Sequence, residues 1–116
     1  MTNAVSRLSP RAPGVPRPVL TYLSGLAPTG RRAMAGRLRV AADLLGGQVE
    51  SLPWHELSHA HMAALRTQLT ERYDSPATVN MTLCAVRGVL RSAFNMGLMS
   101  AEELQRCNAV KPARGQ

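Results

Sequence analysis

The sequence predicts an all-α fold, a small bundle of four to five helices. Apolar residues recur at helical spacing in successive segments, and no segment alternates with a period of two over a convincing length. Only 3% of the residues are aromatic, so the core has to be built from leucine, valine, methionine and alanine side chains, a mixture that favours packed helices. At 116 residues the chain has room for one domain and a tail.

Three regions follow from composition. Residues 1–17 are rich in proline and arginine and are expected to form a flexible basic leader. Residues 18–110 are expected to form the helical domain. Residues 111–116 contain Lys-Pro-Ala-Arg-Gly, which is typical of a linker.

Two helices are predicted between the leader and the glycines at 46 and 47. The first is short, ends before Pro28, and has an apolar face at helical spacing formed by Val19, Tyr22, Leu23 and Leu26. The second is capped by Thr29 and ends at the glycine pair; its apolar face is formed by Met34, Leu38, Ala41 and Leu45.

Three further helices are predicted after a loop through Pro53 and Trp54. Ser58 caps the first of them, whose apolar side is formed by Met62, Leu65, Leu69 and Tyr73. Ser75 followed by Pro76 is a strong start signal for a helix of about six turns that ends at Gly97. Its buried stripe is predicted to be Val79, Leu83, Val86, Leu90, Ala93 and Phe94. Ser100 and Glu103 form a capping box for a short last helix.

Positive charge is concentrated in the N-terminal third. The net charge is +7; residues 1–40 contain seven arginines and no acidic residue, whereas seven basic and seven acidic residues balance beyond them. A localised excess of this kind is typical of a protein that contacts a polyanion, because phosphates gain Coulomb energy and release counterions. A solubilising arm, or a genome that favours arginine, would give the same composition.

The helix that begins at Pro76 also has a polar and basic strip. At 100° per residue this strip lies about 110° from the apolar stripe, and it is formed by Asn80, Cys84, Arg87, Arg91 and Asn95. It is expected to face outward, where its side chains can contact phosphates.

Residues 55–59, His-Glu-Leu-Ser-His, match the HExxH pattern of zinc peptidases. That chemistry needs both histidines on one helical face, but Pro53 and Ser58 indicate a loop that leads into a helix cap. Solvated loop histidines are therefore the preferred interpretation, and a small zinc-dependent hydrolase is an alternative. A second alternative is a helical protein-interaction module.

Cys84 and Cys107 lack the spacing of a metal or redox site and are expected to be reduced.

Three stretches resemble the N-terminal core-binding domain of the tyrosine recombinases, or phage integrases, a SAM-like helical bundle. They are residues 29–39, 52–58 and 75–90. The last, SPATVNMTLCAVRGVL, looks like the family's SPxTxNRxLSALRxxL helix. The likeness covers roughly residues 15 to 112; Met81 departs from a basic residue of many relatives, and Met34 from an aromatic one.

The resemblance implies a domain that holds DNA for recombination and integration rather than one that cuts it. In that family the domain forms half of a clamp around duplex DNA, while a separate catalytic domain, absent here, supplies the tyrosine. The expected DNA contacts are Arg31, Arg32, Arg37 and Arg39 on one helix and Thr78, Asn80, Arg87 and Arg91 on another.

The expected partners are duplex DNA and neighbouring recombinase protomers, with no cofactor, no metal, no catalytic residue and no small-molecule substrate. No run of 18 uncharged apolar residues and no secretory signal is present, so no membrane contact is expected. The expected location is the bacterial cytoplasm, at the nucleoid when the protein is bound to DNA.

Overall fold

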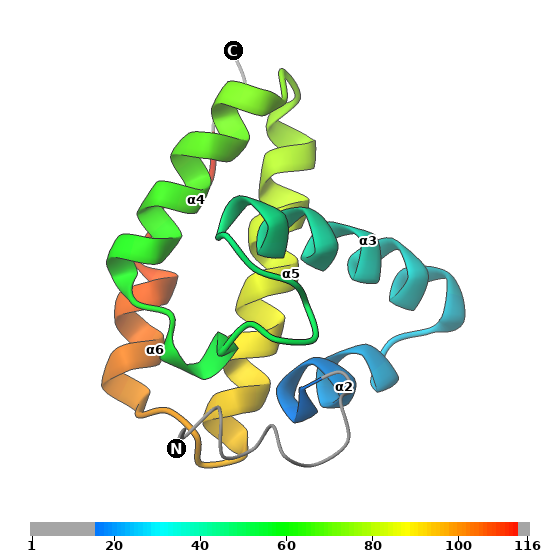
Figure 1. Cartoon of the computed structure of the whole chain (residues 1–116), viewed down its shortest axis with the longest axis vertical. Coiled ribbons are helices and arrows are strands. Elements are labelled where there is room, and N and C mark those ends of the chain that lie inside the picture. The colour runs from blue at the N-terminus through cyan, green and yellow to red at the C-terminus, as the bar shows by residue number, and fades with distance from the viewer. Residues whose placement is uncertain (1–15, 114–116) are drawn as a thin grey trace.

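The computed structural model describes residues 16–113, which form an all-α bundle (Figure 1). No strand occurs among these residues, and the predicted fold class is confirmed. In chain order the helices are α2 (Arg17–Ser24), α3 (Pro28–Leu44), the 3-10 helix η1 (Trp54–Glu56), α4 (His59–Arg72), α5 (Pro76–Asn95) and α6 (Ala101–Asn108).

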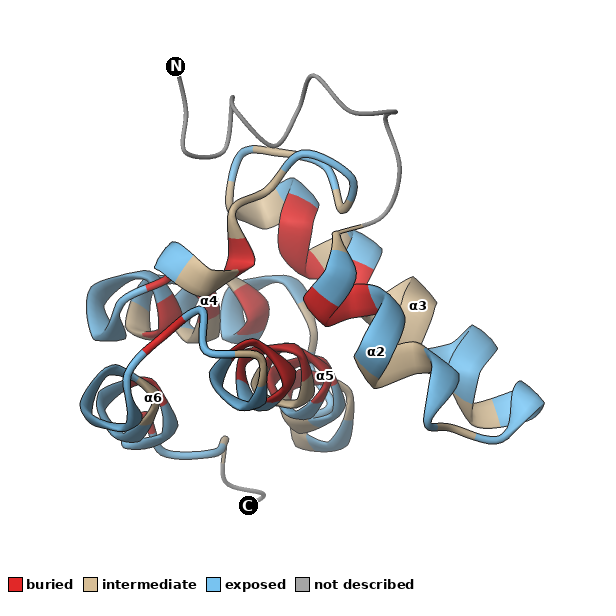
Figure 2. Cartoon of the chain, turned by 90° about the horizontal axis from the view of Figure 1, so that it is seen from below, coloured by how far each residue is buried: buried red, intermediate tan, exposed pale blue. Residues whose placement is uncertain are grey.

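The central element is α5, which packs against α2, α3, η1, α4 and α6. Buried positions lie on the facing sides of α3, α4 and α5, whereas the end of the α2–α3 pair projects into solvent (Figure 2). Because neighbours surround α5 on several sides, it buries more than one stripe: Val79, Thr82, Leu83, Ala85, Val86, Val89, Leu90, Ser92 and Ala93.

The start signals of the later helices act as predicted. Ser75 accepts a hydrogen bond from the backbone N–H of Thr78 at 3.3 Å, and Pro76 occupies the first turn of α5. Ser100 and Glu103 form both hydrogen bonds of a capping box, at 2.9 and 3.0 Å. These contacts join residues three positions apart, so they can be predicted without knowledge of the rest of the fold.

Three predicted details are wrong. The cap of α3 is Ala27 rather than Thr29, because the fixed φ of Pro28 starts the helix without a side-chain cap. Phe94 is 37% exposed, since adjacent residues point about 100° apart and Ala93 takes the inward position. Trp54, expected in a loop, is buried in η1 and donates from Nε1 to the carbonyl oxygen of Val49 at 3.2 Å.

The domain boundaries also shift. Helix α2 begins at Arg17, the last residue of the predicted leader, and Pro18 and Val19 are buried. The bundle therefore starts one residue earlier than predicted. Residues 1–15 of that leader, and residues 114–116 of the predicted linker, lie outside the described residues. At the other end, the chain from Val110 to Ala113 packs on the bundle. Within residues 16–113, no helix is long and apolar enough to cross a bilayer.

Candidate nucleic-acid interface

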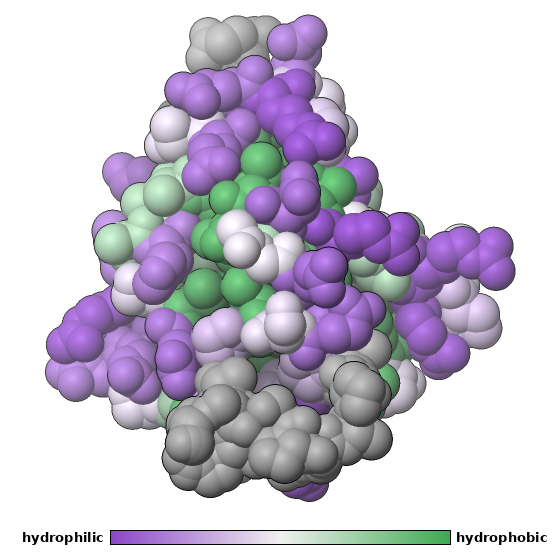
Figure 3. Space-filling model, viewed as in Figure 1, coloured by the Kyte–Doolittle hydropathy of each residue, from purple (hydrophilic) through white to green (hydrophobic). Residues whose placement is uncertain are grey.

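The four arginines predicted to contact DNA from α3 point in different directions. Arg37 and Arg39 are two positions apart, which separates them by about 160° around the helix. Arg32 and Arg39 are seven positions apart and share one side. Both are exposed, whereas Arg37 is half-buried. Figure 3 shows hydrophilic residues covering the part of α3 that projects from the bundle.

Arg31 holds the turn between α2 and α3. Its Nε donates to the carbonyl oxygen of Leu23, and its Nη2 donates to that of Leu26, each at 3.0 Å. Leu23 lies in the last turn of α2 and Leu26 just beyond it, where carbonyl oxygens have no intrahelical partner of the regular kind. Arg31 therefore has a structural task that helical periodicity does not indicate.

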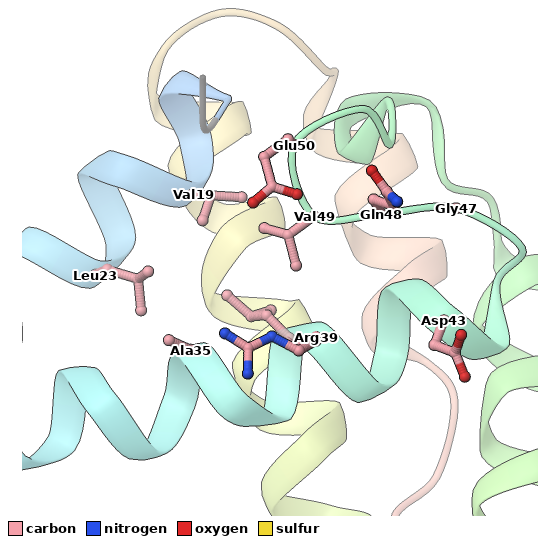
Figure 4. A pocket seen from close by; sticks show the side chains of 10 residues that line it. Val19, Leu23, Ala35, Arg39, Asp43, Gly47, Gln48, Val49 and Glu50 are labelled. Atoms are coloured by element: carbon pink, nitrogen blue, oxygen red, sulfur yellow. The ribbon is translucent and has the colours of Figure 1, made fainter. Parts of the chain in front are cut away.

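Arg39 lies in a pocket of about 420 Å³ between α2, α3 and the loop after α3 (Figure 4). Val19 and Leu23 form part of its apolar wall, while Glu50 enters from the facing loop and Asp43 lies further along α3. Two acidic residues in the same pocket lower the positive potential around the Arg39 guanidinium. Arg39 is therefore less suited to phosphate than its sequence position suggested.

Arg37 reaches the junction of α3, α4 and α5. Its Nη1 donates to Oγ1 of Thr82 at 3.4 Å, and Thr82 Oγ1 donates to the carbonyl oxygen of Thr78 at 3.0 Å. The guanidinium carbon of Arg37 lies 5.7 Å from the centre of the Tyr73 ring. Thr82 thus links Arg37 to the backbone carbonyl of Thr78, a residue predicted from a separate helix.

A second arginine shares that ring. Arg72, at the end of α4, places its guanidinium carbon 5.6 Å from the centre of Tyr73, within the range of a cation–π contact. Its nearest carboxylate is Asp43, at 3.9 Å, and both side chains are exposed. We call Arg37, Arg72 and Tyr73 the arginine–tyrosine cluster. Two cations lie against one ring, and the one ion pair among them in the described residues joins Arg72 to Asp43, which leaves a local positive excess.

Asn80 and Arg87 come together as predicted, but they do not face open solvent. Asn80 Nδ2 donates to the carbonyl oxygen of Ala113 at 3.0 Å, and Asn80 Oδ1 accepts from the Ala113 N–H at 2.7 Å. Arg87 Nη2 donates to the carbonyl oxygen of Val110. The expectation that this strip points outward is wrong for both residues, because the chain after α6 covers them.

Arg66 of α4 binds the same segment from the other side. Its Nε donates to the carbonyl oxygen of Lys111 at 2.8 Å, and its Nη2 donates to that of Pro112 at 3.4 Å. We call Arg66, Asn80 and Arg87 the C-terminal clamp. In Figure 1 the clamped segment runs from α6 toward the end where α4 turns into α5.

Arg91 lies one turn beyond Arg87 on α5 and is exposed. Within residues 16–113 it makes no hydrogen bond or ion pair. Of the strip predicted on this helix, Arg91 is therefore the arginine that is accessible to a ligand.

Sequence reasoning missed Arg66, Arg72 and Tyr73 as polar contact residues. Tyr73 was placed on an apolar face, and its ring is indeed half-buried, but it also supports two guanidinium groups. The available signal was weak: a basic residue beside an apolar stripe. Nothing in the local sequence pairs Arg66 with a backbone 45 residues away.

The HExxH residues do not form a metal site in the described part of the chain. His55 belongs to η1, Ser58 is extended, and His59 begins α4, so the two histidines do not share a helical face. His61 Nδ1 instead accepts from the backbone N–H of Ser58 at 3.0 Å and completes a helix cap. No group of three or more potential metal ligands occurs among residues 16–113. The predicted helix cap at Ser58 is confirmed, but the residues before it form η1 rather than a loop, and His55 is half-buried rather than solvated.

Burial keeps two reactive side chains protonated. It raises the pKa of the Cys107 thiol, and nearby Glu103 raises that pKa further. The Cys107 thiol donates to the carbonyl oxygen of Leu57 at 3.3 Å. Burial, followed by the proximity of Cys84, also raises the pKa of Tyr22. Both cysteines are free thiols, Cys84 exposed and Cys107 buried. Cys107 and Tyr22 therefore act as packing groups, because a nucleophile needs a lowered pKa.

Comparisons with models of protein families, with curated proteins and with solved structures find no match.

Proposed function

We propose that this chain is a duplex-DNA-binding domain of the kind that tyrosine recombinases use to hold a recombination site. In this proposal the domain grips phosphates and takes no part in strand cleavage, which a separate domain carries out. Neighbouring protomers of the recombinase are its protein partners, and the bacterial cytoplasm is its location.

The arginine–tyrosine cluster is the observation that carries the proposal. Arg37 and Arg72 come from different helices and both lie against the Tyr73 ring, and the one ion pair of these arginines in the described residues joins Arg72 to Asp43 at 3.9 Å. Guanidinium groups bind phosphate oxygens through several donors at once, and a fixed ring holds them at lower entropic cost. The net charge of +7 attracts the same ligand over longer distances.

The proposed contact set differs from the one expected from sequence. In this proposal Arg37 and Arg72, which share the Tyr73 ring, form the principal surface together with Thr78 in the first turn of α5, one turn before the Thr82 that Arg37 contacts. Arg32 and Arg91 are exposed and supply outlying contacts. Arg31 holds a helix end, and Arg39 faces acidic neighbours, so both are left out of the principal surface.

The test is the affinity of the chain for a labelled duplex, measured by fluorescence anisotropy over a range of salt concentrations. Four phosphate contacts give a log–log salt slope of about −4. Replacing Arg37 by alanine should weaken binding about tenfold and reduce the magnitude of the slope by about one.

Arg106→Ala is the matched control, because it removes the same charge from α6. Arg106 is exposed, pairs with Glu102 at 3.3 Å, and belongs to α6, which lies beside the start of α4 and away from the turn between α4 and α5 (Figure 1). We expect it to change affinity less than twofold, as a surface charge outside the contact area should. Absence of duplex binding at low ionic strength, or equal losses from both substitutions, would overturn the proposal.

A further inference from the structure

The C-terminal clamp contains an unmet hydrogen-bond donor. Arg87 Nη2 donates to the carbonyl oxygen of Val110, but its Nε is buried and has no partner among the described residues. A buried N–H without an acceptor is destabilising, because it has lost its water and gained nothing in return. The clamped segment therefore satisfies the guanidinium of Arg87 only in part.

A phosphate group would satisfy this side chain better than a peptide carbonyl does. Nε and one Nη of arginine form a planar fork that matches two oxygens of one phosphate. The segment offers Arg87 a single neutral oxygen instead. Arg66 shows the same mismatch, since its two donors are divided between the carbonyls of Lys111 and Pro112, one of them at 3.4 Å.

The attachment of the segment is built almost entirely from backbone atoms. Val110 is buried, whereas Lys111 and Pro112 are exposed, and residues 111–113 have no regular secondary structure. The open groove beside the segment, about 370 Å³, is lined in part by His59, Arg66 and Lys111 and by no acidic residue of the described chain. An anion can therefore approach the clamp from this side without electrostatic repulsion.

We propose that residues 110–113 are a latch over a second phosphate-contact surface, formed by Arg66, Asn80 and Arg87, and that duplex DNA displaces it. This inference rests on the proposed function. In the latched state only the arginine–tyrosine cluster and the exposed arginines meet DNA. Displacement frees two guanidinium groups and one amide, so the unlatched chain binds duplex more tightly.

The test uses a full-length variant that releases the latch but keeps every charge. Val110→Gly removes the buried anchor, and Ala113→Pro removes the N–H that Asn80 Oδ1 accepts at 2.7 Å. The matched control is Ala113→Gly, which retains that N–H. We expect the double variant to bind duplex about tenfold more tightly than the control, with a salt slope steeper by one to two, about one for each added phosphate contact.

Adding Arg87→Ala to the released variant should reverse most of the gain, because the gain depends on that guanidinium. A second measurement does not depend on a variant at all. In the unmodified chain the Nδ2 protons of Asn80 are held by the Ala113 carbonyl, so their exchange with solvent should speed up when duplex is added.

The outcomes separate the two proposals. If the chain binds duplex but the released variant binds no better than Ala113→Gly, or if Asn80 exchange does not change, the latch is overturned and the proposed function stands. If the gain survives Arg87→Ala, the second surface is overturned. If neither the unmodified chain nor the released variant binds duplex at low salt, both proposals are overturned.

Discussion

Arg37 and Arg87 are both half-buried arginines on helices that pack against each other, yet their guanidinium groups contact different partners. Arg37 lies over the Tyr73 ring beside Arg72. Arg87 donates to the backbone of Val110. The difference shows that a polar strip on a helix does not by itself define a ligand site, because a carbonyl oxygen of the same chain can already accept the hydrogen bond that a ligand would need.

The contact partners of the two arginines differ because the backbone around Arg37 is helical, whereas the backbone beside Arg87 is not. Around Arg37 the packed elements are helices, whose carbonyls and N–H groups are already paired within each helix. The chain after α6 is extended, so its backbone groups need partners from outside, and Arg66, Asn80 and Arg87 provide them. The clamp satisfies a backbone, whereas the arginine–tyrosine cluster donates to no backbone carbonyl in the described residues and keeps further guanidinium donors for a ligand.

The largest expected effect is a loss of stability on the face of α5 that packs against α2. This face differs from the two that carry the contacts of Arg37 and Arg87, and its stability gives a reference for theirs. A Cβ atom at Gly88 would lie 2.1 Å from Cε1 of Tyr22, so α2 can approach α5 only because this residue has no side chain. Gly88→Val should lower the free energy of unfolding by about 1–3 kcal/mol, the usual cost of overpacking. Urea unfolding followed by circular dichroism measures it.

Gly36→Ala is the control for Gly88→Val, and we expect it to raise the free energy of unfolding rather than lower it. This glycine lies in the middle of α3, and nothing would lie within 4 Å of an added Cβ. Alanine there should raise the free energy of unfolding by about 0.5–1 kcal/mol, because it restricts the unfolded chain. A destabilisation equal to that of Gly88→Val would mean that helix glycines are needed for another reason.

The next largest effect is the loss of stability when a hydrogen-bonding residue of the C-terminal clamp is removed. Asn80→Ala removes both hydrogen bonds to Ala113 and should cost about 1–2 kcal/mol of stability, about 1 kcal/mol for each bond. Asn95→Ala, at the exposed end of the same strip, should cost less than about 0.5 kcal/mol. Hydrogen exchange at the Ala113 amide measures the local loss; equal protection in both variants would contradict the clamp.

The smallest expected effect concerns the helix that leads into the clamped segment. Hydrogen bonds from the Ser100 backbone and side chain lower the pKa of Glu103 below its ordinary 4.5, and Arg106 and His55 add to the shift. A lowered pKa in the folded state stabilises the fold above the unfolded-state pKa, and this stabilisation is lost as the pH falls through the folded-state pKa.

Glu103→Gln keeps the capping acceptor but does not titrate, so the variant should lose less stability than the unmodified chain on acidification from pH 7 to pH 3. Unfolding in urea at a series of pH values measures the difference. Parallel curves for the two proteins would show that the Glu103 carboxylate does not contribute.

The sequence by itself determined the five α-helices and the start signals of the last three. Ser75 with Pro76, Ser58, and Ser100 with Glu103 act within one helical turn, so no distant residue is needed to read them. The same local signals predicted that a helix cap at Ser58 separates the two histidines of the HExxH pattern, although the residues before the cap form η1 rather than a loop. Helical spacing of apolar residues was enough to predict an all-α bundle.

Only the tertiary structure decided what the polar side chains do. Arg66 meets Lys111 across 45 residues, Asn80 meets Ala113 across 33, and Arg37 meets Thr82 across 45. Helical periodicity gives the direction of a side chain around its own axis, but not which backbone or ring lies opposite it. That depends on how α3, α4 and the extended end of the chain pack around α5, which is a property of the assembled bundle.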